Sequence, residues 1–227
     1  GDIEFGGWFI ASDCTGTAVT QLAPAAYTNS ITLYAKWLNL RTGITLSMSD
    51  YKYGADNIPA PQLSSAAGEL EESPIVNYYC RAKGSSDEWQ KWTVDAEALN
   101  TGDYEMKAEI AATATYKEAT VGPVDFSVEK GTWKFTAPAA KTGLKFNGEA
   151  QALITAGSGS DAFKYKTGAE GEYSASIPAE ANHGTYTVYF KLDGDSNHDE
   201  YVDENGIEVK IAKADWVITP PEAKTLT

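Results

Sequence analysis

The acidic stretch at 193–204 carries the side chains best suited to hold a metal ion. Its sequence is DGDSNHDEYVDE, and oxygen-bearing side chains fill positions 1, 3, 5, 7 and 12 of a calcium-loop template: Asp193, Asp195, Asn197, Asp199 and Glu204. Position 6, where the loop needs Gly, is His198, and no helical pattern flanks the stretch. The other interpretation is a solvated acidic turn in which Asp and Asn cap their own backbone. We expect the turn and keep Ca²⁺ as the alternative.

Two tryptophans, Trp89 and Trp92 in the segment DEWQKWTV, could form a stacking platform for a sugar ring. Because side chains alternate between the two faces of a strand, residues three apart point in opposite directions, and only one of the pair can lie in a core. We therefore expect one buried tryptophan and one that partly covers a sheet edge, with ligand binding as the alternative. Four further tryptophans stand in phase with apolar strand positions and are expected in the core: Trp8, Trp37, Trp133 and Trp216.

Catalytic groups are sparse in this sequence. The only two histidines, His183 and His198, lie in the turn sequences ANHGT and DSNHDE. The segment GSGSD lacks the preceding strand and following helix that a G-x-S-x-G nucleophile elbow requires. Neighbouring carboxylates are frequent in any chain with 32 acidic residues, so they do not indicate acid–base chemistry. We expect no enzyme active site and no cofactor.

The two cysteines, Cys14 and Cys80, form neither a metal-binding nor a redox spacing. Free cysteines are often small, buried apolar residues. We expect that role for both, and a disulfide between two modules is the alternative.

The chain of 227 residues has 18 basic and 32 acidic side chains, which give a formal net charge of −14 spread along its length. Such a surface repels the phosphates of nucleic acids and anionic lipids, whose binding requires clustered Lys and Arg. No run of about 18 apolar residues is present, so the sequence predicts no membrane span. The start, GDIEFGGW, lacks signal-peptide regions, so we expect any export signal and anchor outside this segment. We expect a monomer that binds no nucleic acid and has no direct membrane insertion in this segment.

Alternation of apolar and polar residues is the dominant pattern. The clearest run places four side chains on one face of a strand: Tyr104, Met106, Ala108 and Ile110. Clusters of Gly, Asn, Asp, Pro and Ser separate such runs and supply the turns that hairpins require. The best candidate for a helical turn is the short stretch from Asp95 to Leu99. The sequence therefore predicts an all-β fold.

The sequence also repeats itself. The segment WKFTAPAAKTGL, which starts at Trp133, returns 83 residues later as WVITPPEAKTL, and LNTGDYEMKAEI at 99–110 matches ANHGTYTVYFKL with an offset of 82. A fixed period with the same strand order is typical of tandem modules. We predict four segments, of which the last begins a further copy or forms a terminal strand: 1–40, 41–130, 131–215 and 216–227.

Modules of roughly 85 to 90 residues with several short alternating strands fit small β-sandwiches of immunoglobulin-like architecture. The last strand of each module is followed almost directly by the next module, and only the short sequences EKGTW and AKADW join them. We expect such short linkers to restrict hinging and to produce an extended rod.

The first 40 residues resemble the second half of the Listeria–Bacteroides repeat, the β-grasp-like B-repeat of internalin-type surface proteins. The resemblance rests on GGWFIASDCTGTAV followed by NSITLYAKW. The Gly-rich hairpin that precedes these strands in the family's unit is missing, so the repeat is partial. Because a fragment of this size is marginal as an independent fold, we expect it to pack on the first sandwich or to be loosely ordered.

Residues 131–215 resemble the MBG or YDG-type bacterial immunoglobulin-like domains. The segments KFNGEAQALI, NHGTYTVYFKL and VKIAKAD carry the resemblance. Residues 41–130 depart further, because they keep YKYG, NTGDY and FSVEK but add the stretch QLSSAAGELEESP. The resemblance implies export, a location on the cell surface, and a spacer or adhesive role without catalysis.

These features predict a non-enzymatic stalk or adhesive segment of an extracellular, bacterial cell-surface protein, whose partner is an unknown surface protein or glycan. The alternative is a set of carbohydrate-binding accessory modules of a secreted glycosidase. Ring-dependent binding of a glycan would favour the alternative.

Overall fold

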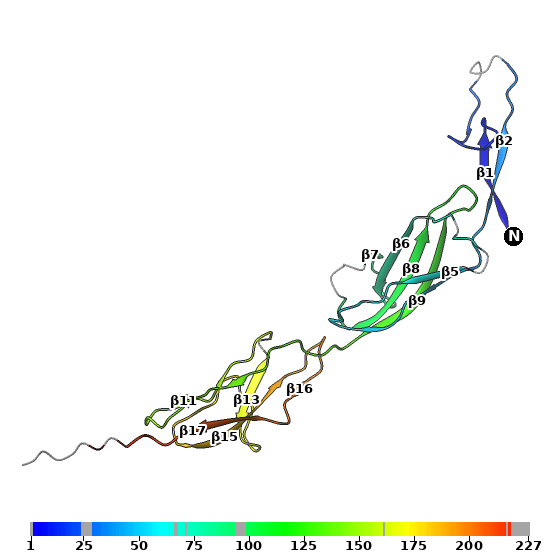
Figure 1. The fold of residues 1–227 in the computed structure, drawn as a ribbon. Helices are drawn as coiled ribbons and strands as arrows, with labels where there is room; N and C mark the ends of the chain where they lie inside the picture. Colours follow the sequence, from blue (N-terminus) through cyan, green and yellow to red (C-terminus); the bar gives the residue numbers. More distant parts are fainter. Residues whose placement is uncertain are drawn as a thin grey trace, which may run out of the picture. The chain divides into compact units, whose positions relative to one another are not determined.

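The computed structural model describes residues 2–23, 29–65, 68–70, 72–93, 99–160, 162–216 and 218. The chain divides into two compact units, Gly1–Glu129 (unit 1) and Lys130–Thr227 (unit 2), coloured blue to green and green to red in Figure 1. The described residues form strands and no helix, which confirms the predicted all-β class. None of them therefore belongs to a helix that could cross a membrane. Residues 95–98 of the predicted helical turn lie outside the described part of the chain.

Unit 1 contains a hairpin and two further sheets. Its strands are β1 (Ile3–Phe9), β2 (Tyr34–Asn39), β3 (Ile44–Ser47), β4 (Tyr51–Lys52), β5 (Gln62–Ser65), β6 (Val76–Ala82), β7 (Gln90–Trp92), β8 (Gly102–Ile110) and β9 (Ala119–Glu129). Strands β1 and β2 pair with each other, β3 pairs with β5, and the remaining strands form a sheet in the order β4-β9-β8-β6-β7.

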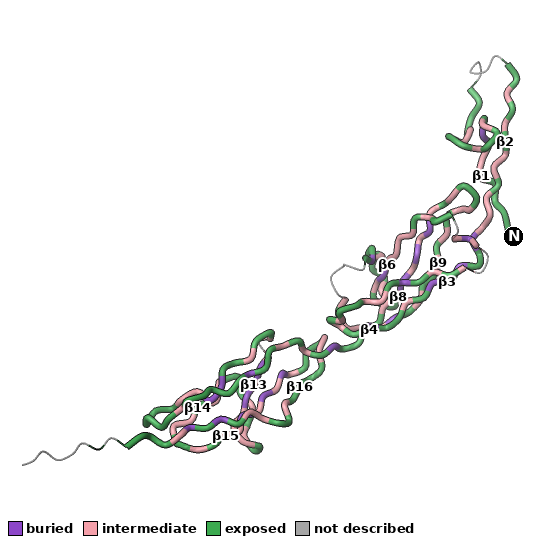
Figure 2. The backbone as a smooth tube through the Cα atoms, in the orientation of Figure 1, coloured by how far each residue is buried: buried purple, intermediate pink, exposed green. Residues whose placement is uncertain are grey.

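The core of unit 1 lies between the β3–β5 pair and the five-stranded sheet. Buried and less buried residues alternate along β8, where Met106 and Ala108 have no exposed surface (Figure 2). Leu46 of β3 belongs to the same buried cluster, so the two sheets meet there. The alternation that predicted this strand reflects one face on the core and one face toward solvent.

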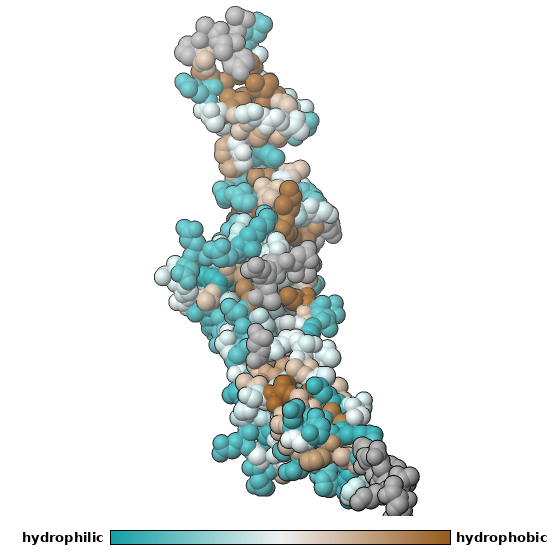
Figure 3. All heavy atoms as spheres, turned by 90° about the vertical axis from the view of Figure 1, so that its left-hand side faces the viewer, coloured by the Kyte–Doolittle hydropathy of each residue, from teal (hydrophilic) through white to brown (hydrophobic). Residues whose placement is uncertain are grey.

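The hairpin of β1 and β2 exposes aromatic residues. A bulge between Phe5 and Gly7 shifts the register, so that Phe5 pairs with Trp37 while Trp8 pairs with Ala35. The three rings therefore share one face, with the Phe5 centroid 5.4 Å from that of Trp8 and 5.5 Å from that of Trp37. In Figure 3 hydrophobic atoms gather on the hairpin, at the top of the view.

The prediction that all four in-phase tryptophans lie in the core is wrong for three of them. Trp8 is 45% exposed, Trp37 57% and Trp216 93%, whereas Trp133 is half-buried against the core of unit 2. Alternation places Trp8 and Trp37 on one face, but a core position also requires a second layer. The described residues leave this face of the hairpin uncovered.

Unit 2 is built around its longest strand. Its strands are β10 (Ala139–Ala140), β11 (Gln151–Ala152), β12 (Ile154–Thr155), β13 (Phe163–Thr167), β14 (Ala179–Glu180), β15 (Gly184–Leu192), β16 (Tyr201–Val202) and β17 (Ile207–Ile211). Strand β15 pairs with β13 on one side and with β16 and β17 on the other. Its alternating residues Val188 and Leu192 have no exposed surface and pack with Leu153, Val209 and Ile211.

Each unit contains a parallel pairing at or just after its last strand. In unit 1, Tyr51 of β4 lies opposite Val128 of β9. In unit 2, Ala212, which follows β17, forms a parallel bridge with Lys145. There the Phe146 amide donates to the Ala212 carbonyl at 2.8 Å, and the Ala212 amide donates to Leu144 at 2.9 Å. Two further isolated bridges, Asn39 with Tyr116 and Gly131 with His198, are also parallel. Among the described residues, the other pairings between two named strands are antiparallel.

Candidate functional site

The predicted calcium loop follows β15 and begins with a carboxylate that is already paired with two lysines. Asp193 contacts the ammonium groups of Lys164 and Lys191, with 2.7 Å between its Oδ1 and the Lys191 Nζ. The Lys164 and Lys191 ammonium groups hold the pKa of Asp193 below its ordinary value. Asp193 and Glu200 in turn raise the pKa of Lys191, whose Nζ lies 2.8 Å from the Glu200 carboxylate.

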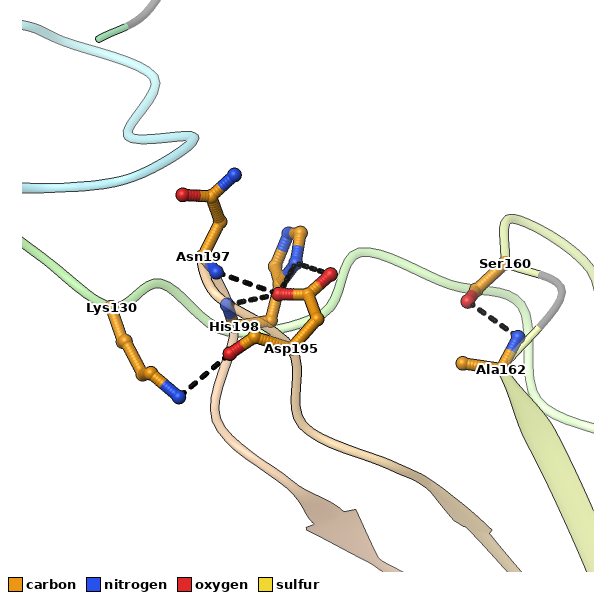
Figure 4. A network of polar contacts seen from close by, with 6 residues as sticks. All are labelled: Lys130, Ser160, Ala162, Asp195, Asn197 and His198. Carbon is orange, nitrogen blue, oxygen red and sulfur yellow. Dashed lines mark hydrogen bonds and ion pairs between the residues drawn. The ribbon is translucent and has the colours of Figure 1, made fainter. Parts of the chain in front are cut away.

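The second carboxylate of the loop, that of Asp195, accepts hydrogen bonds from backbone amides of the same turn. Asp195 Oδ1 accepts hydrogen bonds from the amides of Asn197 at 2.7 Å and His198 at 2.6 Å (Figure 4). The same carboxylate lies 3.0 and 3.1 Å from His198 Nδ1. The hydrogen bond from His198, and then those from the backbone amides, lower the pKa of Asp195. This is the Asp-capped turn that the sequence favoured over a metal site.

The five residues of the calcium template are not brought together as a ligand set. Asp193 faces lysines across the sheet, whereas Asp195 faces its own turn. Within the described part of the chain, no group of three or more His, Cys, Asp or Glu side chains could hold a metal ion. The lysine contacts of Asp193 and the turn hydrogen bonds of Asp195 engage both of these carboxylates.

The turn instead holds the first residues of unit 2. The Gly131 amide donates to the Asn197 carbonyl at 2.9 Å, and the Asp199 amide donates to the Gly131 carbonyl at 3.1 Å. The Lys130 ammonium adds a bond to the Asp195 carbonyl at 2.7 Å (Figure 4). We call this arrangement, together with the stack of Trp133 on His198, the unit 2 clamp. The two rings of that stack lie nearly parallel, at 14°, with centroids 4.0 Å apart.

Unit 1 has a clamp with the same backbone geometry. The Asn39 amide donates to the Thr115 carbonyl at 2.9 Å, and the Lys117 amide donates to the Asn39 carbonyl at 3.0 Å. Two residues after the clamped residue, Arg41 places its guanidinium 5.2 Å from the centroid of the Tyr116 ring. Arg41 and Tyr116 thus take the places that Trp133 and His198 take in the unit 2 clamp.

Arg41 is the buried centre of the unit 1 clamp, with 9% of its surface exposed. Its Nε donates to the Glu69 carbonyl at 3.2 Å and its Nη1 to the Ala111 carbonyl at 3.0 Å, and Nη1 also reaches the Lys117 carbonyl. Because a guanidinium has five donors and no acceptor, backbone carbonyls from separate loops can converge on it. Arg41 therefore ties the segment between β2 and β3 to the loops that follow β5 and β8.

Sequence reasoning missed both clamps, although a signal for them was present. The offset of 82 residues that aligns 99–110 with 181–192 also aligns 115–117 with 197–199. These are the two turns that hold Asn39 and Gly131. The partner of each turn lies far away in the sequence, so the alignment alone could not identify it.

The two candidate sugar-binding tryptophans are separated by the sheet. Trp92 is 7% exposed and packs in the core of unit 1, as one of the pair was expected to do. Trp89 is half-buried on the other face, where its ring lies 4.4 Å from the Arg81 guanidinium and 5.3 Å from the Lys107 ammonium. Two cationic side chains of the protein therefore lie over the Trp89 ring. Trp89 and Trp92 form no common stacking platform.

The two cysteines are unpaired and differ in burial. Cys80 is 4% exposed, in the core of unit 1, and burial raises the pKa of its thiol. Cys14 was also expected to be buried, but it is only partly so. It closes a turn in which its amide donates to the Ala11 carbonyl at 3.0 Å, and its φ of 55° is left-handed. The predicted role as a buried apolar residue holds for Cys80 and is wrong for Cys14.

The two histidines stand beyond opposite ends of β15. His183 precedes Gly184, the first residue of the strand, and His198 follows the last, Leu192. A strand of 9 residues spans roughly 30 Å, so the two imidazoles cannot act on one substrate atom.

No family model and no curated protein matches this chain.

Proposed function

We propose that this chain is a non-enzymatic, load-bearing segment of an extracellular bacterial surface protein, in which tandem modules serve as a stalk for adhesion. The observation that carries the proposal is the length of the connection between the units. The Glu129 carbonyl accepts a hydrogen bond from the Tyr53 amide at 2.9 Å, and the Gly131 amide donates to the Asn197 carbonyl at 2.9 Å. Only Lys130 separates a residue bonded into unit 1 from a residue bonded into unit 2.

A connection of one residue has very few free torsion angles. Flexible linkers gain reach and freedom with each residue added, whereas a single residue between two anchored neighbours permits little hinging. Lys130 is itself held, because its ammonium donates to the Asp195 carbonyl at 2.7 Å. Restricted hinging is the property that a spacer needs in order to hold a binding partner away from the cell envelope.

The parallel pairings suit a segment under tension. When force is applied to the two ends of a unit, two neighbouring parallel segments are pulled past each other along their length. The hydrogen bonds between them lie across the force and must break together, whereas a hairpin pulled from one end opens bond by bond. Tyr51 with Val128 and Lys145 with Ala212 provide this geometry, and the bridges of Asn39 with Tyr116 and Gly131 with His198 are also parallel.

Both units share local features that support the proposal of immunoglobulin-like tandem modules. Strands β8 and β15 have the same burial pattern over nine residues. Each also carries a tyrosine near its start whose hydroxyl bonds back to the chain four residues upstream, from Tyr104 to Asn100 and from Tyr186 to Asn182. A tyrosine of this kind is a hallmark of immunoglobulin-type sandwiches.

A second candidate function follows from the exposed rings of the hairpin. Phe5, Trp8 and Trp37 offer adjacent aromatic surface, which is what a glycan partner would stack on. This observation favours the carbohydrate-binding alternative on the hairpin in place of the Trp89 and Trp92 region. In a glycan array screen, binding that Trp8→Ala and Trp37→Ala remove and Trp89→Ala leaves intact would support it. Absence of ring-dependent binding would contradict it.

The stalk proposal is tested by the width of the distance distribution between the units. Spin labels at the exposed positions of Lys91→Cys and Glu170→Cys, in a Cys14→Ser background, report this distribution by pulsed electron paramagnetic resonance. The matched control carries a flexible Gly-Ser insertion after Lys130. We expect a narrow distribution for the native connection and a broad one for the insertion. Equal widths would contradict the proposal.

A further inference from the structure

A cavity of about 240 Å³ lies beside the unit 2 clamp. Three aromatic and three polar residues line it: Trp133, Phe135, Tyr201, Thr132, Asp199 and Glu200. The first three come from the start of the unit and from β16, which the clamp brings side by side. We call this cavity the aromatic pocket.

The rings of the aromatic pocket are held in place by their neighbours. Phe135 and Tyr201 meet at 63° with centroids 4.9 Å apart, so they form two walls of a corner. Phe163 and Phe190 pack edge-on against Phe135, at centroid distances of 5.7 and 6.0 Å. Trp133 is fixed by its stack on His198. Because these side chains are ordered by packing, little conformational entropy remains to be lost when a ligand binds.

The charged groups of the pocket are both acidic. Glu200 pairs with Lys191 at 2.8 Å, which offsets part of its charge. Asp199 forms no ion pair with any residue in the described part of the chain, and it is exposed. The net charge of the chain is −14, so the surrounding field also attracts cations.

Aromatic walls with carboxylates at the rim match one ligand chemistry. The negative faces of aromatic rings attract cations, and quaternary ammonium groups are bound in cages of this kind because they need no hydrogen-bond acceptor. A metal ion would need several converging oxygen ligands and a sugar several hydrogen-bonding groups, whereas the lining has only two carboxylates, one of them paired with Lys191, beside its aromatic walls. We propose that the aromatic pocket binds a quaternary ammonium headgroup, either free or on a lipid.

The direct test is titration of the full chain with choline, followed by NMR at constant ionic strength. The probe is the Trp133 indole N–H, whose nitrogen is buried and donates to no acceptor among the described residues. We expect a saturable shift with a Kd on the order of 1 mM, the range that a few cation–π contacts provide. The neutral isostere 3,3-dimethyl-1-butanol should cause no saturable shift. Equal affinity for the isostere, or no shift with choline, would overturn the proposal.

Variants distinguish choline binding in the aromatic pocket from a nonspecific effect of choline on the protein. Tyr201→Ala should weaken choline binding about tenfold, whereas Tyr201→Phe, which keeps the ring, should preserve it. Asp199→Asn should weaken it by a few fold and reduce its dependence on salt. Phe146→Ala removes a ring that is 39% exposed and outside the pocket, and it should have no effect. Unchanged binding in Tyr201→Ala, with native dispersion of the β17 resonances, would contradict the pocket.

Phosphatidylcholine vesicles distinguish the two sources of the headgroup. Cosedimentation that free choline competes away and that Tyr201→Ala abolishes would assign the headgroup to a lipid. Binding of choline without cosedimentation would assign it to a small molecule. Cosedimentation that Tyr201→Ala leaves intact would mean that another surface holds the vesicle, and it would count against the pocket as the lipid site.

Discussion

The hydroxyl of Tyr186 donates a hydrogen bond to the backbone carbonyl of Asn182 at 2.9 Å, across the turn that opens β15. Tyr104 makes the same bond to Asn100 at 2.8 Å. In both places a glycine lies against the ring: Gly102 before Tyr104 and Gly184 before Tyr186. The sequence pattern Asn-x-Gly-x-Tyr therefore has a structural cause, because the ring folds back over the glycine to reach the asparagine.

Removal of this hydroxyl should destabilise one unit at a time. Tyr186→Phe is expected to lower the free energy of unfolding of unit 2 by about 1 kcal/mol, the usual contribution of one hydrogen bond. Urea denaturation followed by NMR resonances of each unit measures this change. Tyr201→Phe, which removes a hydroxyl with no such bond in the described structure, is the control. An equal loss in both variants would show that the bond to Asn182 has no special role.

The unit 2 clamp should open locally when its stacked ring is removed. His198→Ala removes the ring that covers Trp133 and the partner of the Asp195 carboxylate, so we expect faster hydrogen exchange at the Gly131 amide by about tenfold. The Val209 amide, in the core strand β17, should exchange as before. His183→Ala, at the other end of β15, is the matched control. Unchanged protection of Gly131 would mean that the backbone bonds alone hold the clamp.

Acid should weaken unit 2 through Asp195. Its pKa is lowered in the folded state, so its contribution to stability is present above the ordinary aspartate pKa of about 3.9 and is lost as the pH falls through the lower folded value. We expect Asp195→Asn to reduce the loss of stability between about pH 5 and pH 2. Asp199→Asn is the control, because Asp199 forms no ion pair with a described residue. Equal pH profiles for the native chain and Asp195→Asn would contradict this role.

Calcium should have no effect on the acidic turn. Asp193 is paired with two lysines and Asp195 with its own backbone, so binding would first have to break these contacts. We expect the Tm in a low-salt buffer to be unchanged by about 1 mM Ca²⁺, a concentration at which extracellular calcium modules bind. A rise in Tm that Asp193→Asn and Asp199→Asn abolish would restore the calcium interpretation.

Local pattern was enough to predict the strands but not the contacts that join them. The alternation at Met106 and Ala108 predicted a half-buried strand, because the period of two follows from backbone geometry alone. The clamps depend on pairs such as Gly131 with His198, which are distant in the sequence and have no local signature. The exposure of Trp8 and Trp37 could not be predicted either, since periodicity identifies a shared face and cannot show whether a second layer covers it.

The candidate site, too, could be predicted from the sequence only where short-range chemistry determines it. The Asp-capped turn at Asp195 follows from short-range chemistry, and the sequence favoured it over a metal loop. The aromatic pocket requires Phe135 and Tyr201 to meet, which depends on the pairing of β16 with β15. Neither the spacing nor the composition of these residues indicates that pairing.

Single-molecule pulling of the chain by its two ends tests the stalk proposal most directly. Phe146→Pro removes the amide that donates to the Ala212 carbonyl, and Phe146→Ala, which keeps that amide, is the matched control. We predict two unfolding events for the native chain and for Phe146→Ala, with one of the two moved to a lower force in Phe146→Pro. If the forces of both events are the same in all three proteins, the parallel pairing bears no load and the central claim is contradicted.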